Sequence, residues 1–217
     1  MKILVTSPSP CKLKSYRIRH RLPRAKGFSL LEVLISIVIL SFGLLGMVGL
    51  QAAALQANRD SRLQSVATTL AREMAEMMRG NKDVGRLNTV AANTYLGQFS
   101  NPTGTTPLAP TTVSFCLNVG ALPCTSKTAI AQAQMTEWLT RVDAQLPGAH
   151  VEICLDDQPF DTNGLPQWNC PSSVTGGTIM IKIGWTRNST NRSNTGAQVL
   201  EKAIRPSVIF PITAGAV

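Results

Sequence analysis

The chain contains few of the residues on which enzyme chemistry depends. Among 217 residues there are two histidines, His20 and His150, and aromatic side chains make up 5%. The sequence shows neither a glycine-rich phosphate loop nor the cysteine and histidine spacing of a metal site. A serine or cysteine nucleophile needs a base beside it, and His150 is the single histidine that follows the basic N-terminal segment. We therefore expect a protein that is not an enzyme, with no cofactor and no bound metal.

Acidic residues are absent from the first 27 residues, which hold eight of the 21 lysines and arginines. The formal net charge of the chain, +9, is by itself compatible with a nucleic-acid-binding protein. After residue 27, however, 13 basic side chains are interleaved with all 12 acidic ones. The basic character is thus a property of the N-terminal segment, and we expect no nucleic-acid partner.

Charge of either sign is absent from residues 33–58, a run dense in Leu, Ile, Val, Ala and Gly. As a helix with a rise of ~1.5 Å per residue, this run is about 39 Å long, enough to cross a hydrocarbon core. A buried helix of a soluble protein is the alternative, but such helices are seldom so long and so free of charge. The cations before the run predict a cytoplasmic N-terminus and a body on the opposite side of the membrane.

An ordinary secretory signal fits this segment poorly, because its cleavage site would follow the apolar run. Here the notable junction, Gly27-Phe28, precedes the run. The stretch "KGFSLLE", residues 26–32, resembles the class III signal of type IV pilins and pseudopilins. The resemblance implies that a prepilin peptidase cuts after Gly27 and N-methylates Phe28. It also implies that Glu32 pairs with the α-amino group of Phe28 on a neighbouring subunit.

Glu32 needs a physical explanation even without the resemblance. A carboxylate at membrane depth costs several kcal/mol unless it is paired, so such a residue predicts a function. An apolar environment would strengthen its pairing with an amine and penalise a misplaced subunit. The alternative is that Glu32, near one end of the span, extends to the membrane interface and has no assembly role.

We expect one helix from Phe28 to about Arg79, because apolar residues continue at helical spacing from Asp60 to Arg79. The resemblance divides the chain into a leader, residues 1–27, a transmembrane and assembly segment, residues 28–57, and a periplasmic globular domain, residues 58–217. Before assembly the protein would lie in the inner membrane, and afterwards in a pilus fibre at the cell surface.

Two further blocks resemble the PilV group of minor pilins. They are "LLGMVGLQ", residues 44–51, and "LAREMAEMMRGN", residues 70–81, in which Glu73 replaces the usual Asp and Met77 the usual Arg. The resemblance implies a structural subunit that helps to initiate assembly and display of pili, with roles in adhesion and motility. Its partners would be other major and minor pilins and the pilus assembly platform. The alternatives are a minor pseudopilin of a type II secretion system and a periplasmic binding domain on a membrane anchor.

The rest of the chain predicts an α+β fold of the type IV pilin kind. Residues 81–112 have the composition of a loop, and a second amphipathic helix is expected at residues 126–146. Alternating apolar residues predict strands at 151–155 and 179–186. A last strand at 198–204 is expected to form a hairpin with the strand before it. We expect a small antiparallel sheet packed on the C-terminal half of the long helix.

Five cysteines are present, of which Cys11 lies in the basic leader. An even number in a body that leaves the cytoplasm predicts two disulfides, and zinc is the weaker alternative because the spacing lacks C-x-x-C. Of the three pairings that are possible, we favour the two local ones, Cys116–Cys124 and Cys154–Cys170.

The second disulfide would close a loop that contains Asp156, Asp157, Asp161 and Asn163. These oxygen ligands would suit Ca²⁺, but their spacing is not that of an EF-hand, and a solvated loop is the preferred interpretation. In the pilin family a C-terminal cystine loop often forms an exposed surface, so we expect partner contacts here.

Overall fold

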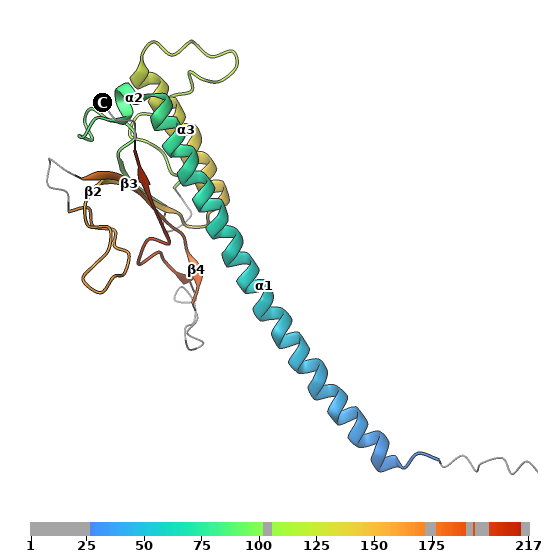
Figure 1. Ribbon diagram of the computed structural model, residues 1–217. Coiled ribbons are helices and arrows are strands. Elements are labelled where there is room, and N and C mark those ends of the chain that lie inside the picture. The colour runs from blue at the N-terminus through green and yellow to red at the C-terminus, as the bar shows by residue number, and fades with distance from the viewer. Residues whose placement is uncertain (1–26, 102–105, 172–176, 190–192, 194–199, 214–217) are drawn as a thin grey trace, which may run out of the picture. The chain divides into compact units, whose positions relative to one another are not determined.

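The structure is a computed structural model that describes residues 27–101, 106–171, 177–189, 193 and 200–213. The predicted leader therefore lies outside the described residues except for Gly27. The chain divides into two compact units, one before Ala52 and one from Ala52 onward. Helix α1, Leu30–Gly80, contributes residues to both units (Figure 1). The predicted α+β fold is confirmed: the structure has a long N-terminal apolar helix and a small antiparallel sheet.

The serine side chains in the first half of α1 bond to the backbone of the same helix and do not disturb it. The hydroxyl groups of Ser36 and Ser41 each donate to the carbonyl four residues earlier, Glu32 O and Ile37 O, at 2.7 Å. This bonding satisfies the hydroxyls within an apolar stretch. One window of α1 has a mean hydropathy of 2.6 with 0% of it buried, so the helix is long and apolar enough to span a membrane.

The second half of α1 buries one stripe of side chains at helical spacing. The stripe repeats small and large residues, which lets another helix approach closely while the long side chains fill the core. It consists of Ala67, Leu70, Ala71, Met74, Ala75 and Met78. The stripe packs against α3, Lys127–Gln145, which lies beside it (Figure 1).

Helix α3 agrees with the predicted helix within one residue at each end. Ser126 is the N-cap, and its hydroxyl oxygen accepts the N–H of Ala129 at 3.1 Å. The helix ends ahead of Pro147, which cannot continue it. Trp138 of α3 is fully buried, and its indole N–H donates to Leu70 O of α1 at 3.0 Å.

The sheet has the order β1-β2-β3-β6, and all its neighbours are antiparallel. Its strands are β1, Gly97–Ser100; β2, His150–Asp156; β3, Thr178–Gly184; and β6, Val208–Ile212. The register places Ile153 opposite Ile181 and Val151 opposite Ile183. These side chains join the core formed by α1 and α3. Leu155 and Ile179, a further opposed pair, also belong to this core. The side chains that alternate with these residues in β2 and β3 face the other side of the sheet.

Two predictions about the body were wrong in part. Residues 81–112 are not all loop, because they contain the one-turn helix α2, Lys82–Gly85, and the edge strand β1. Both elements are four residues long, too short for a periodic pattern to show in the sequence.

The last strand is also placed differently. Only Leu200–Glu201 of the predicted segment 198–204 is observed as a strand, β5, and residues 198 and 199 lie outside the described part of the chain. Strand β5 pairs with β4, Arg187–Asn188, whereas the neighbours of β3 are β2 and β6. Pro211 obscured β6 in the sequence, but proline is tolerated on an edge strand, where its missing N–H breaks no ladder bond.

Candidate functional site

The residues of the N-terminal signal lie at the start of α1. Gly27 is exposed, and a Cβ atom placed on it would have no neighbour within 4 Å. Phe28 is 82% exposed and precedes the first helical turn. The Gly27-Phe28 junction is thus open to solvent on both sides of the peptide bond.

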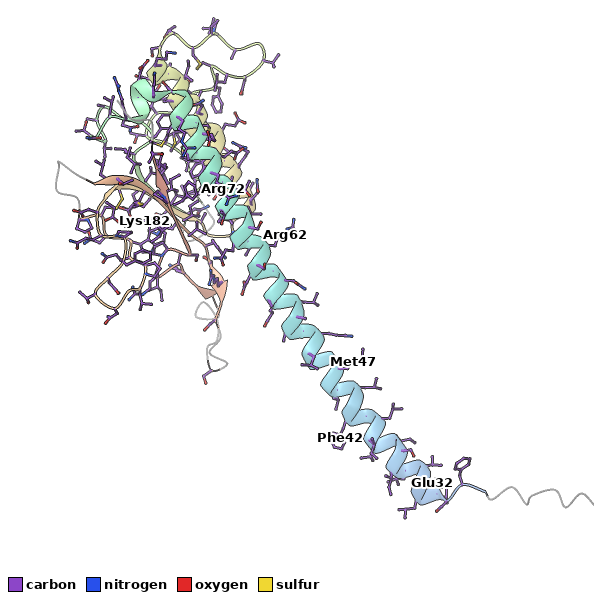
Figure 2. All side chains as sticks on the ribbon, in the orientation of Figure 1. Glu32, Phe42, Met47, Arg62, Arg72 and Lys182 are labelled. Atoms are coloured by element: carbon purple, nitrogen blue, oxygen red, sulfur yellow. A yellow bond between two sulfur atoms is a disulfide. The ribbon has the colours of Figure 1, made fainter. Side chains whose placement is uncertain are left out.

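Glu32 belongs to the first turn of α1 (Figure 2). It shares a shallow surface groove with Phe28, Val33, Ser36, Ile37 and Leu40. None of the ion pairs found among the described residues includes Glu32. The groove therefore presents one carboxylate on an apolar surface, an arrangement that can accept a cationic group from another molecule.

The outer face of the sheet is covered by the cystine loop, residues 154–170. The disulfide Cys154–Cys170 closes this loop, with a Cα–Cα distance of 6.4 Å. Trp168 of the loop stacks on His150 of β2, with ring centroids 3.9 Å apart, and donates its indole N–H to Ala203 O at 2.9 Å. A Cβ atom at Gly184 would lie 2.8 Å from the Trp168 ring, so this close approach requires glycine.

Beneath the loop lies a fully buried ion pair. Lys182 Nζ of β3 is 2.6 Å from Asp156 Oδ2 of β2, and both side chains are 0% exposed (Figure 2). The same nitrogen donates to two loop carbonyls, Asn169 O at 2.7 Å and Trp168 O at 3.3 Å. Asp156 Oδ1 accepts the backbone N–H of Gln158 at 2.8 Å. The pair thus joins two strands and the loop that covers them.

Glu152 stands next to this pair, directly opposite Lys182 in the register. Burial raises the pKa of the Glu152 carboxyl; Lys182 opposes this shift and Asp156 adds to it. Its carboxylate lies close to the sulfur atoms of Cys154 and Cys170. Because those sulfur atoms form a disulfide, they offer no thiolate to a metal ion.

Two of the acidic residues that suggested Ca²⁺, Asp156 and Asp161, have internal partners. Asp156 is used by Lys182 and Gln158. Asp161 accepts the N–H groups of Asn163 and Leu165 and pairs with Arg205 at 2.8 Å. The Leu165 N–H, and after it the Arg205 guanidinium, lower the pKa of the Asp161 carboxyl. The preferred interpretation, a loop without Ca²⁺, agrees with these contacts.

The other disulfide joins Cys116 to Cys124, which is the second of the two local pairings favoured from the sequence. It closes a loop just before α3. Apolar side chains are exposed in and beside this loop: Val113, Phe115, Leu117, Val119 and Leu122. The sequence analysis did not single out this surface, although the run of uncharged residues before Lys127 was a visible signal.

The buried Lys182–Asp156 pair was also missed. Its signal in the sequence is one lysine within the alternating strand "TIMIKIG". That lysine occupies a position on the face opposite the isoleucines, and in an antiparallel sheet such a face is commonly solvated. Only the fold of the cystine loop onto that face buries the lysine.

Comparison with known proteins gives one result. Residues 22–48 match the prokaryotic N-terminal methylation motif. No curated protein and no solved structure matches the chain. The motif implies processing by prepilin peptidase and association with other pilins. Together with the long apolar helix and the small sheet, the match supports a protein of the type IV pilin family, a subunit of a pilus or pseudopilus.

Proposed function

We propose that this chain is a minor pilin, resembling the PilV group, that helps to initiate assembly and surface display of type IV pili. Adhesion and twitching motility would depend on it through the fibre. The observation that carries the proposal is the first half of α1, which is apolar, 0% buried within its most apolar window and largely contained in the methylation motif, residues 22–48. A helix that buries nothing within its own chain needs lipid or other subunits to cover it.

The proposed mechanism follows from the residues of the signal. Prepilin peptidase removes residues 1–27 and methylates the amino group of Phe28. The segment 28–57 then leaves the inner membrane for a bundle of other pilin helices at the assembly platform. This transfer exchanges one apolar environment for another, so the hydrophobic cost is small. Glu32 pairs with the Phe28 amine of a neighbouring subunit and sets the register between subunits.

The structure explains the second of the two blocks that resemble the PilV group, "LAREMAEMMRGN". Within residues 70–81, Leu70, Met74 and Met78 are buried against the body. Glu73, which replaces the usual Asp, pairs with Arg141 of α3 at 2.6 Å. Through these contacts, residues 70–81 hold the helix to the rest of the periplasmic body, residues 58–217. This packing suits a minor pilin and equally a minor pseudopilin of a type II secretion system, which is the second candidate.

The decisive experiment is intact-mass measurement and N-terminal sequencing of the protein from membranes and from sheared surface fibres. We expect a chain that begins at N-methyl-Phe28 in both fractions. The variant Gly27→Leu should keep its leader, since a side chain at Gly27 meets nothing in the described structure and acts only at the peptidase. Ser29→Ala is the matched control and should be processed normally. A wild-type chain that retains Gly27 in cells with active peptidase would overturn the proposal.

Fibres also separate the two candidates. Recovery of the processed chain from sheared pili supports the minor pilin. A processed chain that is absent from pili and required for protein secretion supports the pseudopilin.

A further inference from the structure

The pair Lys182–Asp156 combines three features that are rarely found together. An amine and a carboxyl group are in direct contact at 2.6 Å, both are 0% exposed, and a second carboxyl group, Glu152, lies opposite Lys182 on the neighbouring strand. A buried ion pair is a weak source of stability, because removing two charges from water costs several kcal/mol per ion. A reaction that removes both charges would abolish this cost.

We propose that Lys182 and Asp156 condense to an intramolecular amide that links β3 to β2 covalently. The amide forms between Nζ of Lys182 and Cγ of Asp156. One carboxyl C–O bond breaks, and its oxygen leaves as water with two protons from the lysine nitrogen. The ammonium and carboxylate become one neutral amide and one water molecule, and no oxidation or reduction takes place.

The hydrogen bonds around Asp156 distinguish its two oxygens. Oδ1 accepts the backbone N–H of Gln158 at 2.8 Å, so this donor stabilises the negative charge that develops on Oδ1 during attack. Oδ2 faces Lys182 Nζ at 2.6 Å and is the oxygen that leaves. In the product, Oδ1 becomes the amide carbonyl oxygen and keeps the bond from Gln158.

The lysine nitrogen is held by the cystine loop. The carbonyl oxygens of Asn169 and Trp168 lie 2.7 Å and 3.3 Å from Nζ, and they orient the amine beside the carboxyl group. The single N–H of the product amide has an acceptor ready in Asn169 O. Holding two reacting groups in contact is worth effective concentrations of about 10⁵–10⁸ M in favourable cases.

Glu152 can relay the protons. Its carboxyl group interacts electrostatically with both Lys182 and Asp156, and burial raises its pKa, so it exchanges a proton more readily near neutral pH. Lys182 forms its ion pair with Asp156 and not with Glu152, so the proton passes from the attacking nitrogen to Glu152 through one bridging water molecule. Glu152 then returns a proton to the leaving oxygen in the same way.

The test is a peptide map and intact mass of the full-length protein purified from membranes in detergent. After reduction and alkylation of both disulfides, we expect a mass lower by one water than the sequence and its processing require. Trypsin should not cut after Lys182, so residues 142–187 should appear as one peptide. Chymotrypsin then cuts after Phe160 and Trp168, between the two residues, and the fragments that contain Asp156 and Lys182 should remain joined. Complete cleavage after Lys182, with no mass deficit, would overturn the proposal.

Variants assign the roles. Glu152→Gln keeps the ion pair and should abolish the joined peptide or reduce it at least about tenfold, since it loses the proton relay. Asp156→Asn should form the same amide with loss of ammonia in place of water. Lys182→Arg should contain no joined peptide, and Lys202→Arg, an exposed lysine in the same body, should resemble the wild type.

The wild-type map decides the question even if Lys182→Arg fails to fold. A joined peptide that persists at wild-type level in Glu152→Gln would overturn the role of Glu152. The result is independent of the proposed pilus function, because it concerns only the body of the protein.

Discussion

The two halves of α1 are parts of one helix but have opposite relations to the rest of the chain. Apolar side chains of the first half are exposed; Phe42, for example, is 71% exposed. In the second half the stripe that includes Leu70 and Met74 is buried against α3 and the sheet. The difference shows that a continuous helical backbone does not determine which of its side chains are buried. The partners of the second half lie in the chain, whereas the most apolar window of the first half is not buried by any of the described residues.

Two carboxylates of the second half differ in the same way from Glu32 of the first half. Glu73 in the second half pairs with Arg141 of α3, and Glu76 pairs with Arg79 one turn later. Glu32 in the first half belongs to none of the ion pairs among the described residues. The comparison predicts that changes in the first half alter assembly alone, whereas changes in the second half and the body alter stability.

The largest effect is expected from removing the carboxylate of the first half. Glu32→Ala should reduce incorporation into fibres at least about tenfold, since a charged hydrogen-bonded pair contributes roughly 1.5–3 kcal/mol. Thermal unfolding of the body should not change. Glu76→Ala is the matched control, because its side chain is exposed and its ion pair among the described residues is with Arg79, one turn away on the same helix. Quantitative immunoblots of sheared fibres measure the effect, and equal incorporation of both variants would contradict the comparison.

The next effect concerns the contact between α1 and α3. Trp138→Ala removes a fully buried side chain and its bond to Leu70 O, so it should lower the free energy of unfolding by about 3–5 kcal/mol. Phe42→Ala, a truncation of similar size in the first half, should leave that free energy unchanged. Denaturant titration of both full-length variants in detergent checks this. A similar loss in both would show that the first half packs on the body.

The two disulfides should differ in their contribution to stability. Replacing Cys154 and Cys170 by alanine opens the longer loop and should cost about 3 kcal/mol, against about 2.5 kcal/mol for Cys116 and Cys124. The longer loop also covers the Lys182–Asp156 pair, which increases the difference. Neither double variant should affect cleavage after Gly27. Chemical denaturation and N-terminal sequencing measure the two properties separately.

The smallest effect is a pH dependence of the body. Burial lowers the pKa of His150 below its usual 6.5. The unfolded chain therefore takes up a proton first as pH falls, and the free energy of unfolding decreases below about pH 6.5. His150→Phe should preserve stacking on Trp168 and flatten this decrease. Thermal midpoints at several pH values test this, and parallel curves for the variant and the wild type would contradict it.

Much of the architecture could be predicted because local patterns determined it. The apolar run, the amphipathic repeat and the cap at Ser126 each depend on neighbouring residues, and α1 and α3 were placed within a few residues of their observed ends. The methylation motif likewise occupies one continuous segment, residues 22–48. The roles of Gly27, Phe28 and Glu32, and the boundaries at residues 27 and 57, remain predictions.

The sheet was harder to predict because strand partners are distant in the sequence. The short strand β1 and the proline-containing strand β6 become strands only when β2 and β3 offer them backbone hydrogen bonds. The strand propensity of a short segment depends on its own residues and does not indicate which distant strands will pair with it.

The sequence by itself determined the apolar helix, the position of Glu32 at the start of its uncharged run and the local spacing of the cysteines. Only the tertiary structure decided what happens to Lys182. A lysine on the outer face of a strand is ordinarily solvated, but the cystine loop folds over it and supplies Asn169 O, while Asp156 comes from the next strand. Burial of a charge depends on groups that converge from three segments of the chain, and no local pattern specifies that convergence.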